Sequence, residues 1–200
     1  NIIELFPGIA VDLPGFGKSK SLENSLSPFE YATYLNDIIP PEINTFVGHS
    51  FGGRVAVHLS FLREINNLVL IGVPLLRITP KKRFVNKLTL FKNLNKFGLV
   101  SSATVESIKN KTGSFDYRNS EGVMRETLVK AVNDDLEDKL PNIKSNVKLV
   151  WGENDMDVPV SIAEKSQKLI SNSELTIIPN QGHNMLRSNP ISVFEVLKSL

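Results

Sequence analysis

Apolar residues along this chain follow two patterns that alternate with each other. Short, nearly continuous apolar runs are typical of strands buried on both faces, and longer segments with apolar residues every three or four positions are typical of amphipathic helices. Their alternation predicts βαβ units around a parallel sheet. The predicted strands cover residues 9–11, 43–47, 68–71, 147–151 and 175–178. The predicted helices are a helix end at 1–6, then 28–39, 51–62, 161–170 and a last helix that opens at Pro190.

The helix at 28–39 has strong signals at both ends. Ser27 is placed to cap it, Pro28 suits its first turn, and Glu30 completes a capping box with Ser27. Two prolines at 40–41 end it. The residues predicted to form its apolar face are Tyr31, Leu35, Ile38 and Ile39.

The strand signal disappears between residues 75 and 141, where the pattern is mainly helical and richer in Lys, Asn and Ser. We interpret this stretch as a helical lid inserted into one α/β domain. The expected division is therefore a core over 1–74, a lid over 75–141 and a second part of the core over 142–200.

Composition narrows the class of protein. The 200 residues carry a formal net charge of +2, so nothing global favours nucleic acid as a partner. Disulfides and thiolate metal sites are excluded because the chain has no cysteine. No apolar run approaches the roughly 18 residues of a membrane span, so we expect no stable membrane insertion and a cytoplasmic protein. The chain starts at Asn1, in what reads as the tail of a helix. We therefore expect N-terminal strands to be missing. Whether a signal peptide precedes Asn1 is an open question.

The residues 48–52, Gly-His-Ser-Phe-Gly, fit the pattern Gly-x-Ser-x-Gly between a predicted strand and a predicted helix. A strand that turns sharply into a helix leaves Ser50 at the apex, and glycines on both sides allow the backbones to pass. The helix N-terminus also brings N–H groups close to the serine oxygen. This context predicts a nucleophile at Ser50, against the alternative of a buried serine in a glycine-rich turn.

A serine hydroxyl needs a base to remove its proton, and the chain offers three histidines. We expect His49 to point away from Ser50, since the two are adjacent. His58 lies about two turns into the next helix, and we interpret it as structural. His183 lies in a loop after the last predicted strand, where such sheets bind ligands, and is the predicted base.

The base needs an acid to hold its tautomer, and the loop after the strand at 147–151 offers three carboxylates. Asp155 is the predicted acid, with Asp157 as the main rival and Glu153 as a further neighbour. The order Ser50, Asp155, His183 along the chain is the nucleophile–acid–histidine order of one large hydrolase fold.

Four segments in order resemble the landmarks of the α/β-hydrolase superfamily, in its serine esterase-like branch. They are residues 11–19 (VDLPGFGKS), 48–53 (GHSFGG), 151–155 (WGEND) and 182–183 (GH). The resemblance covers nearly the whole chain apart from the lid. It implies a mostly parallel sheet with flanking helices, a triad of Ser50, Asp155 and His183, and a main-chain oxyanion donor at Phe51.

The resemblance implies a hydrolase of carboxylic esters or related acyl bonds, with a small-molecule acyl substrate and no metal or organic cofactor. The alternatives are a thioesterase, amidase, C–C hydrolase or perhydrolase of the same fold, or a ligand-binding protein without turnover. Acyl specificity and oligomeric state stay open. The basic stretch at 77–96 has no acidic residue. We interpret it as a solvated helix covering the site; attraction of an anionic substrate and contact with a membrane surface are the alternatives.

Overall fold

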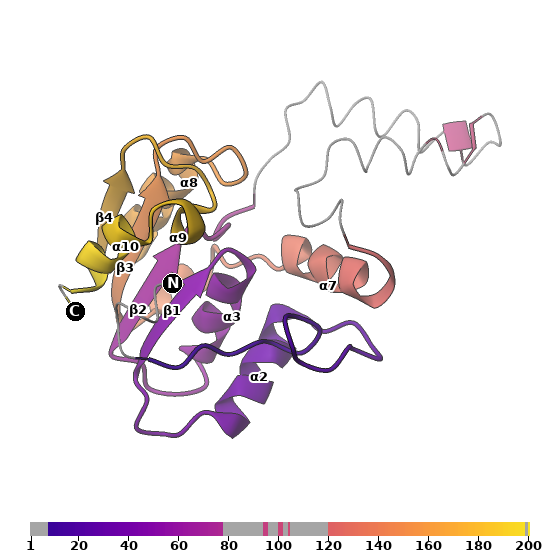
Figure 1. Cartoon of the computed structure of the whole chain (residues 1–200), viewed down its shortest axis with the longest axis horizontal. Helices are drawn as coiled ribbons and strands as arrows, with labels where there is room; N and C mark the ends of the chain where they lie inside the picture. Colours follow the sequence, from indigo (N-terminus) through magenta and orange to yellow (C-terminus); the bar gives the residue numbers. More distant parts are fainter. Residues whose placement is uncertain (1–7, 78–93, 96–99, 102–103, 105–119, 199) are drawn as a thin grey trace.

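The computed structural model describes residues 8–77, 94–95, 100–101, 104, 120–198 and 200 (Figure 1). Within them, four parallel strands form one sheet in the order β1-β2-β3-β4. They are β1 (Thr45–His49), β2 (Asn67–Ile71), β3 (Asn146–Gly152) and β4 (Ser173–Ile178). Because all four run in the same direction, their carboxyl ends lie at the same edge of the sheet.

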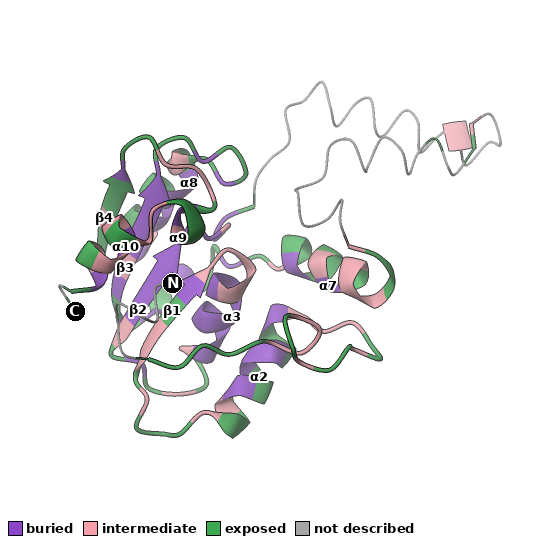
Figure 2. Ribbon diagram, viewed as in Figure 1, coloured by how far each residue is buried: buried purple, intermediate pink, exposed green. Residues whose placement is uncertain are grey.

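Helices cover both faces of this sheet, as the nearly continuous apolar strands predict. On β2, Leu68 and Leu70 belong to the core under α3 (Phe51–Leu59) and α8 (Val160–Leu169). Val69 and Ile71 alternate with them and join the core under α9 (Met185–Ser188) and α10 (Pro190–Leu197). The purple strands of Figure 2 show this burial in the middle of the molecule. The predicted α/β class with a mostly parallel sheet is confirmed.

Helix α2 (Pro28–Ile38) packs on α3 and begins as its sequence predicts. The backbone N–H of Glu30 donates to Ser27 Oγ at 3.3 Å, and the N–H of Ser27 donates to the Glu30 carboxylate at 2.6 Å. Tyr31 and Leu35 are buried, but Ile38 is 51% exposed because it closes the helix at its free end. The apolar face is therefore shorter than predicted.

Helix α7 (Gly122–Asn133) lies within the predicted lid, and a 3-10 turn, η1 (Leu140–Asn142), crosses its predicted end at residue 141. Thr127 of α7 is fully buried and accepts the Leu26 N–H at 3.2 Å, which holds the helix against the loop that precedes α2 (Figure 1). Most of the predicted lid, including nearly all of the basic stretch at 77–96, lies outside the described residues. The domain limits at 75 and 141 stay predictions.

The strand predicted at 9–11 is wrong. Residues 8–13 have no regular secondary structure, and Ile9 is 75% exposed. A strand is defined by hydrogen bonds to a neighbour, and no described segment pairs with these residues. An apolar run alone therefore did not identify a strand here. The helix end predicted at 1–6 lies outside the described residues.

Other differences concern the ends of elements. Strand β1 starts two residues later than predicted because the Ile43 N–H closes a turn on Pro40 O at 3.2 Å. Helix α3 ends at Leu59 instead of residue 62, where Ser60 Oγ bonds back to Val57 O at 2.7 Å. Helix α9 was not predicted. Of the helices in the described ranges, none is long and apolar enough to span a bilayer.

Candidate active site

Three of the predicted site residues lie just beyond the carboxyl ends of three strands. Ser50 follows β1, Asp155 follows β3 and His183 follows β4. His183 Nε2 lies 3.0 Å from Ser50 Oγ, and His183 Nδ1 lies 2.8 Å from Asp155 Oδ2. The structure thus brings together side chains separated by up to 133 positions in the sequence.

Ser50 sits in a strained turn between β1 and α3. Its φ of 49° and ψ of −115° lie in a region that few residues other than glycine adopt. Its N–H donates to Ile71 O at 3.0 Å, so the turn is fastened to β2. The strain presents the hydroxyl at the apex, ahead of the first turn of α3.

The glycines around Ser50 do not all have the same role. A Cβ on Gly48 would lie 2.5 Å from Gly53 Cα, and a Cβ on Gly53 would overlap Val73. A Cβ on Gly52 would meet no atom within 4 Å in the described structure. The crossing of β1 and α3 therefore requires Gly48 and Gly53, whereas the sequence pattern points to Gly48 and Gly52.

Phe51 is the first residue of α3, so its N–H has no carbonyl one turn earlier in the helix to accept it. The partial positive charge of the helix N-terminus adds to this donor. The Phe51 ring packs edge-on against Tyr31, at 5.2 Å between centroids, and at a tilt of 33° against Phe16, at 5.4 Å. Tyr31 OH donates to Pro14 O at 2.8 Å, and burial raises the pKa of Tyr31 to about 12. This cluster ties the loop before α2 to the turn that carries Ser50.

Asp155 is the carboxylate that reaches His183, and its side chain is fully buried. Its second oxygen accepts the N–H groups of Asp157 at 3.0 Å and Val158 at 2.7 Å. Trp151 Nε1 donates to Val158 O at 2.9 Å, which fastens this loop to β3. Since a carboxylate only accepts, His183 Nδ1 carries the proton and Nε2 of the neutral ring faces the Ser50 hydroxyl.

The two rival carboxylates lie elsewhere. Asp157 is exposed and contributes only its backbone N–H to Asp155. Glu153 is also exposed, and its carboxylate accepts the Asn180 N–H at 2.9 Å. Asn180 has a φ of 58°, so Glu153 stabilises a tight turn on the way to His183.

Gly72 is a part of the site that sequence reasoning missed as such. It follows β2 with a φ of 54°, and a Cβ there would lie 3.2 Å from both Asp155 Oδ2 and His183 Nδ1. The hydrogen-bonded pair therefore rests directly on the backbone of Gly72. A glycine directly after β2, the strand between β1, which precedes Ser50, and β3, which precedes Asp155, is the signal that points to this contact.

The other two histidines do not face the serine as a base. His49 Nε2 lies 2.9 Å from the main-chain oxygen of His183. His58 Nε2 lies 2.7 Å from Asp134 Oδ2, and Arg54 Nη1 donates to Asp134 O at 2.6 Å. Burial works to raise the pKa of Asp134, but the hydrogen bond and charge of His58, with the charges of Arg54 and Lys139, outweigh burial and leave that pKa lowered.

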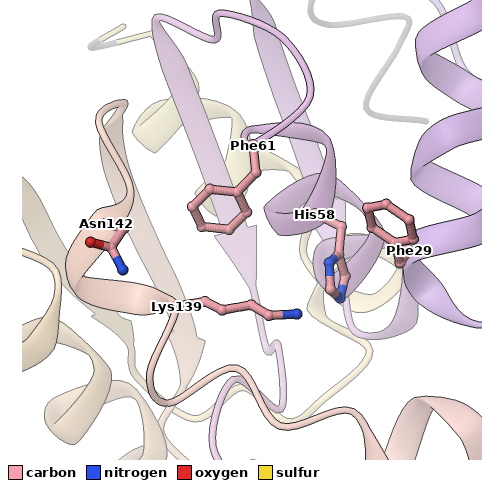
Figure 3. A pocket seen from close by; sticks show the side chains of 5 residues that line it. All are labelled: Phe29, His58, Phe61, Lys139 and Asn142. Carbon is pink, nitrogen blue, oxygen red and sulfur yellow. The ribbon is translucent and has the colours of Figure 1, made fainter.

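A hollow of about 290 Å³ lies beside His58 (Figure 3). Its lining residues are Phe29, His58, Phe61, Lys139 and Asn142. His58 is already bonded to Asp134, and none of Ser50, Asp155 and His183 lines the hollow. The hydrogen-bonded system at the strand ends, and not this hollow, is where the described residues can move a proton to or from a hydroxyl. In the described ranges, no three His, Asp or Glu side chains are grouped as metal ligands would be.

Comparison with known proteins identifies the family and agrees with the fold. The sequence model of the alpha/beta hydrolase family matches residues 4–196. A 2-hydroxy-6-oxononadienedioate/2-hydroxy-6-oxononatrienedioate hydrolase of Escherichia coli is 27% identical over 199 aligned positions, covering 88% of this chain and 69% of that protein.

Solved structures with the same fold include enzymes of two kinds. An esterase from Exiguobacterium antarcticum superposes with a TM-score of 0.70 at 22% identity, over 95% of this chain and 79% of that one. A thermophilic esterase superposes with a TM-score of 0.69 at 26% identity, over 96% of this chain and 79% of that one. A meta-cleavage product hydrolase from Pseudomonas fluorescens gives 0.63 at 17% identity, over 94% and 76%.

Proposed function

Since this chain belongs to the alpha/beta hydrolase family, we propose that it is a serine hydrolase that cleaves a carboxylic ester. The observation that carries the proposal is the position of the His183 ring. It lies 3.0 Å from Ser50 Oγ on one side and 2.8 Å from Asp155 Oδ2 on the other. The first separation lets the ring act as a general base on the hydroxyl, and the second lets the carboxylate orient the ring.

In the first step, Ser50 Oγ attacks the acyl carbonyl carbon while its proton passes to His183 Nε2. Asp155 holds the ring by its Nδ1–H and stabilises the imidazolium that forms. Its buried carboxylate keeps two backbone N–H bonds throughout, so it needs no reorganisation. The Phe51 N–H, at the start of α3, stabilises the negative charge that develops on the carbonyl oxygen.

In the second step, the C–O bond to the leaving alcohol breaks and His183 Nε2 gives it the proton. The acyl group then remains on Ser50 as an ester. A water molecule attacks this ester with His183 again as base, which releases the carboxylic acid and restores the serine.

Hydrolysis of a C–C bond is a second candidate, because the Escherichia coli relative is described as a 2-hydroxy-6-oxononadienedioate hydrolase. The two candidates share the fold and differ in the substrate. Purified protein assayed with p-nitrophenyl acetate and with 2-hydroxy-6-oxononadienedioate separates them. The proposal predicts turnover of the ester; turnover of the dienedioate alone favours the second candidate.

A fluorophosphonate probe tests the nucleophile itself. We expect the protein to be labelled and Ser50→Ala to lose both labelling and turnover, by about 10⁴-fold or more. Ser161→Ala, which changes an exposed serine on α8, is the matched control and should label as the wild type does. Labelling that persists in Ser50→Ala would reject Ser50 as the nucleophile. Binding without turnover would favour the ligand-binding alternative.

A further inference from the structure

His49 contacts the main chain of the residue that we propose as the base. Its Nε2 lies 2.9 Å from His183 O, and the two imidazole centroids are 4.9 Å apart. A carbonyl oxygen only accepts, so His49 Nε2 carries the proton and donates it. The bond joins two residues 134 positions apart in the sequence.

The alternation of side chains along β1 explains how His49 reaches this loop. His49 pairs in register with Ile71, which belongs to the core under α9 and α10. Successive residues of a strand point to opposite faces, so His49 lies on the face where α9 begins. Helix α9 starts at Met185, two residues after His183. The side chain next to the serine therefore points away from the serine and toward the loop of the base.

Other hydrogen bonds hold the same loop from different sides. The Asn154 N–H donates to Gln181 O at 2.8 Å, and Ser188 Oγ donates to the Gln181 side chain at 2.9 Å. These bonds come from the loop of the acid and from α9. The bond from His49 comes from β1, the strand that carries Ser50 at its end.

We infer that His49 is a positioning residue that fixes the distance between Ser50 and His183. This inference rests on the proposed function. Because His49 is adjacent to Ser50 and bonds to the main chain of His183, it ties the nucleophile and the base to one short segment of β1. A shift of about 1 Å between catalytic groups costs up to about 100-fold in rate. Loss of the bond should therefore lower kcat with little effect on KM, since His49 acts through the base.

Three variants separate the hydrogen bond from the bulk of the ring. His49→Gln keeps an amide N–H at nearly the reach of the imidazole Nε2, His49→Asn has the same amide one methylene shorter, and His49→Leu keeps apolar bulk without a donor. We expect kcat for p-nitrophenyl acetate to fall about 10-fold in the Asn and Leu variants and by less than about threefold in Gln, with KM within about twofold in all. The rate of fluorophosphonate labelling should follow the same order.

Thermal unfolding and near-UV circular dichroism identify any variant that fails to fold. If Leu does not fold, the Gln and Asn pair still tests the inference, because only their reach differs. Equal losses in Gln and Asn, or wild-type kcat in Asn, would overturn it. If the wild-type protein is neither labelled nor active, the proposed function fails and the inference falls with it.

Discussion

Gly48 and Gly53 pack backbone against backbone where β1 turns into α3, so closely that a Cβ on Gly48 would lie 2.5 Å from Gly53 Cα. Gly53 also faces Val73, while a Cβ on Gly52 would meet no atom within 4 Å among the described residues. We therefore expect Gly53→Ala to lower the free energy of unfolding by about 1–3 kcal/mol through overpacking. Gly52→Ala, its matched control, should be neutral or stabilising by up to about 1 kcal/mol, because alanine favours the helix. Urea unfolding of both variants measures this, and equal destabilisation would contradict it.

Asp155 and Asp157 provide a second matched pair. Asp155→Asn keeps an acceptor for the two N–H bonds but no longer holds the Nδ1–H tautomer of His183. We expect kcat to fall about 10⁴-fold, the size of loss that this change causes in a Ser-His-Asp triad. The kcat of Asp157→Asn should stay within about twofold of the wild-type value, since the exposed Asp157 carboxylate is not bonded to Asp155 or His183. Steady-state kinetics with p-nitrophenyl acetate checks both; a large loss in Asp157→Asn would reverse the assignment.

The ionisation of Asp134 should make the free energy of unfolding depend on pH in the acidic range. Its pKa is lowered in the folded protein from the ordinary value of 3.8, so its contribution is present above about pH 4 and is lost as the pH falls through the folded-state pKa. We expect the difference in unfolding free energy between wild type and Asp134→Asn to shrink between pH 5 and pH 2. A pH-independent difference for Asp134→Asn would contradict the ion-pair interpretation.

Tyr31 should make the stability of the fold depend on pH in the alkaline range. Burial raises its pKa to about 12 from 10.0, so the fold prefers the protonated phenol. The contribution is therefore complete below about pH 10 and is lost as the pH rises through about 12. Tyr31→Phe should lower the unfolding free energy by about 1–2 kcal/mol at pH 7, because Pro14 O loses its donor. Its stability should also fall less steeply than that of the wild type above pH 10. The free energy of unfolding of the two proteins, measured at pH 7 and above pH 10, tests this.

Local signals in the sequence were sufficient for most of the sheet and for the three side chains that lie together at the strand ends, Ser50, Asp155 and His183. The capping box at Ser27, the turn at Ser50 and the four parallel strands each depend on neighbours a few positions away, which a pattern records. The same holds for Asp155, which alternates with two exposed carboxylates along one loop. The catalytic roles of these residues stay predictions until they are tested.

Contacts made over long separations were not predictable in this way. Residues 9–11 have the composition of a strand, but pairing depends on a neighbour that composition does not show. The spacing of Gly-x-Ser-x-Gly points to Gly52, whereas the steric demand falls on Gly53 because Val73 crosses there. The contact of His49 with His183 needs the register of β1 and β2 together with the position of α9, and neither is visible in the sequence alone.

The pairing of β2 with β3 joins the part of the chain that holds Ser50 to the part that holds Asp155 and His183, with Ile71 opposite Val150. A slip of one residue in this pairing would carry Asp155 and His183 together by about 3.3 Å along the strands. The same slip would turn Val147 and Leu149 out of the core that they share with α8. Apolar packing therefore sets the position of the site: the strand register that buries the core is also the register that brings the His183 imidazole to the Ser50 hydroxyl.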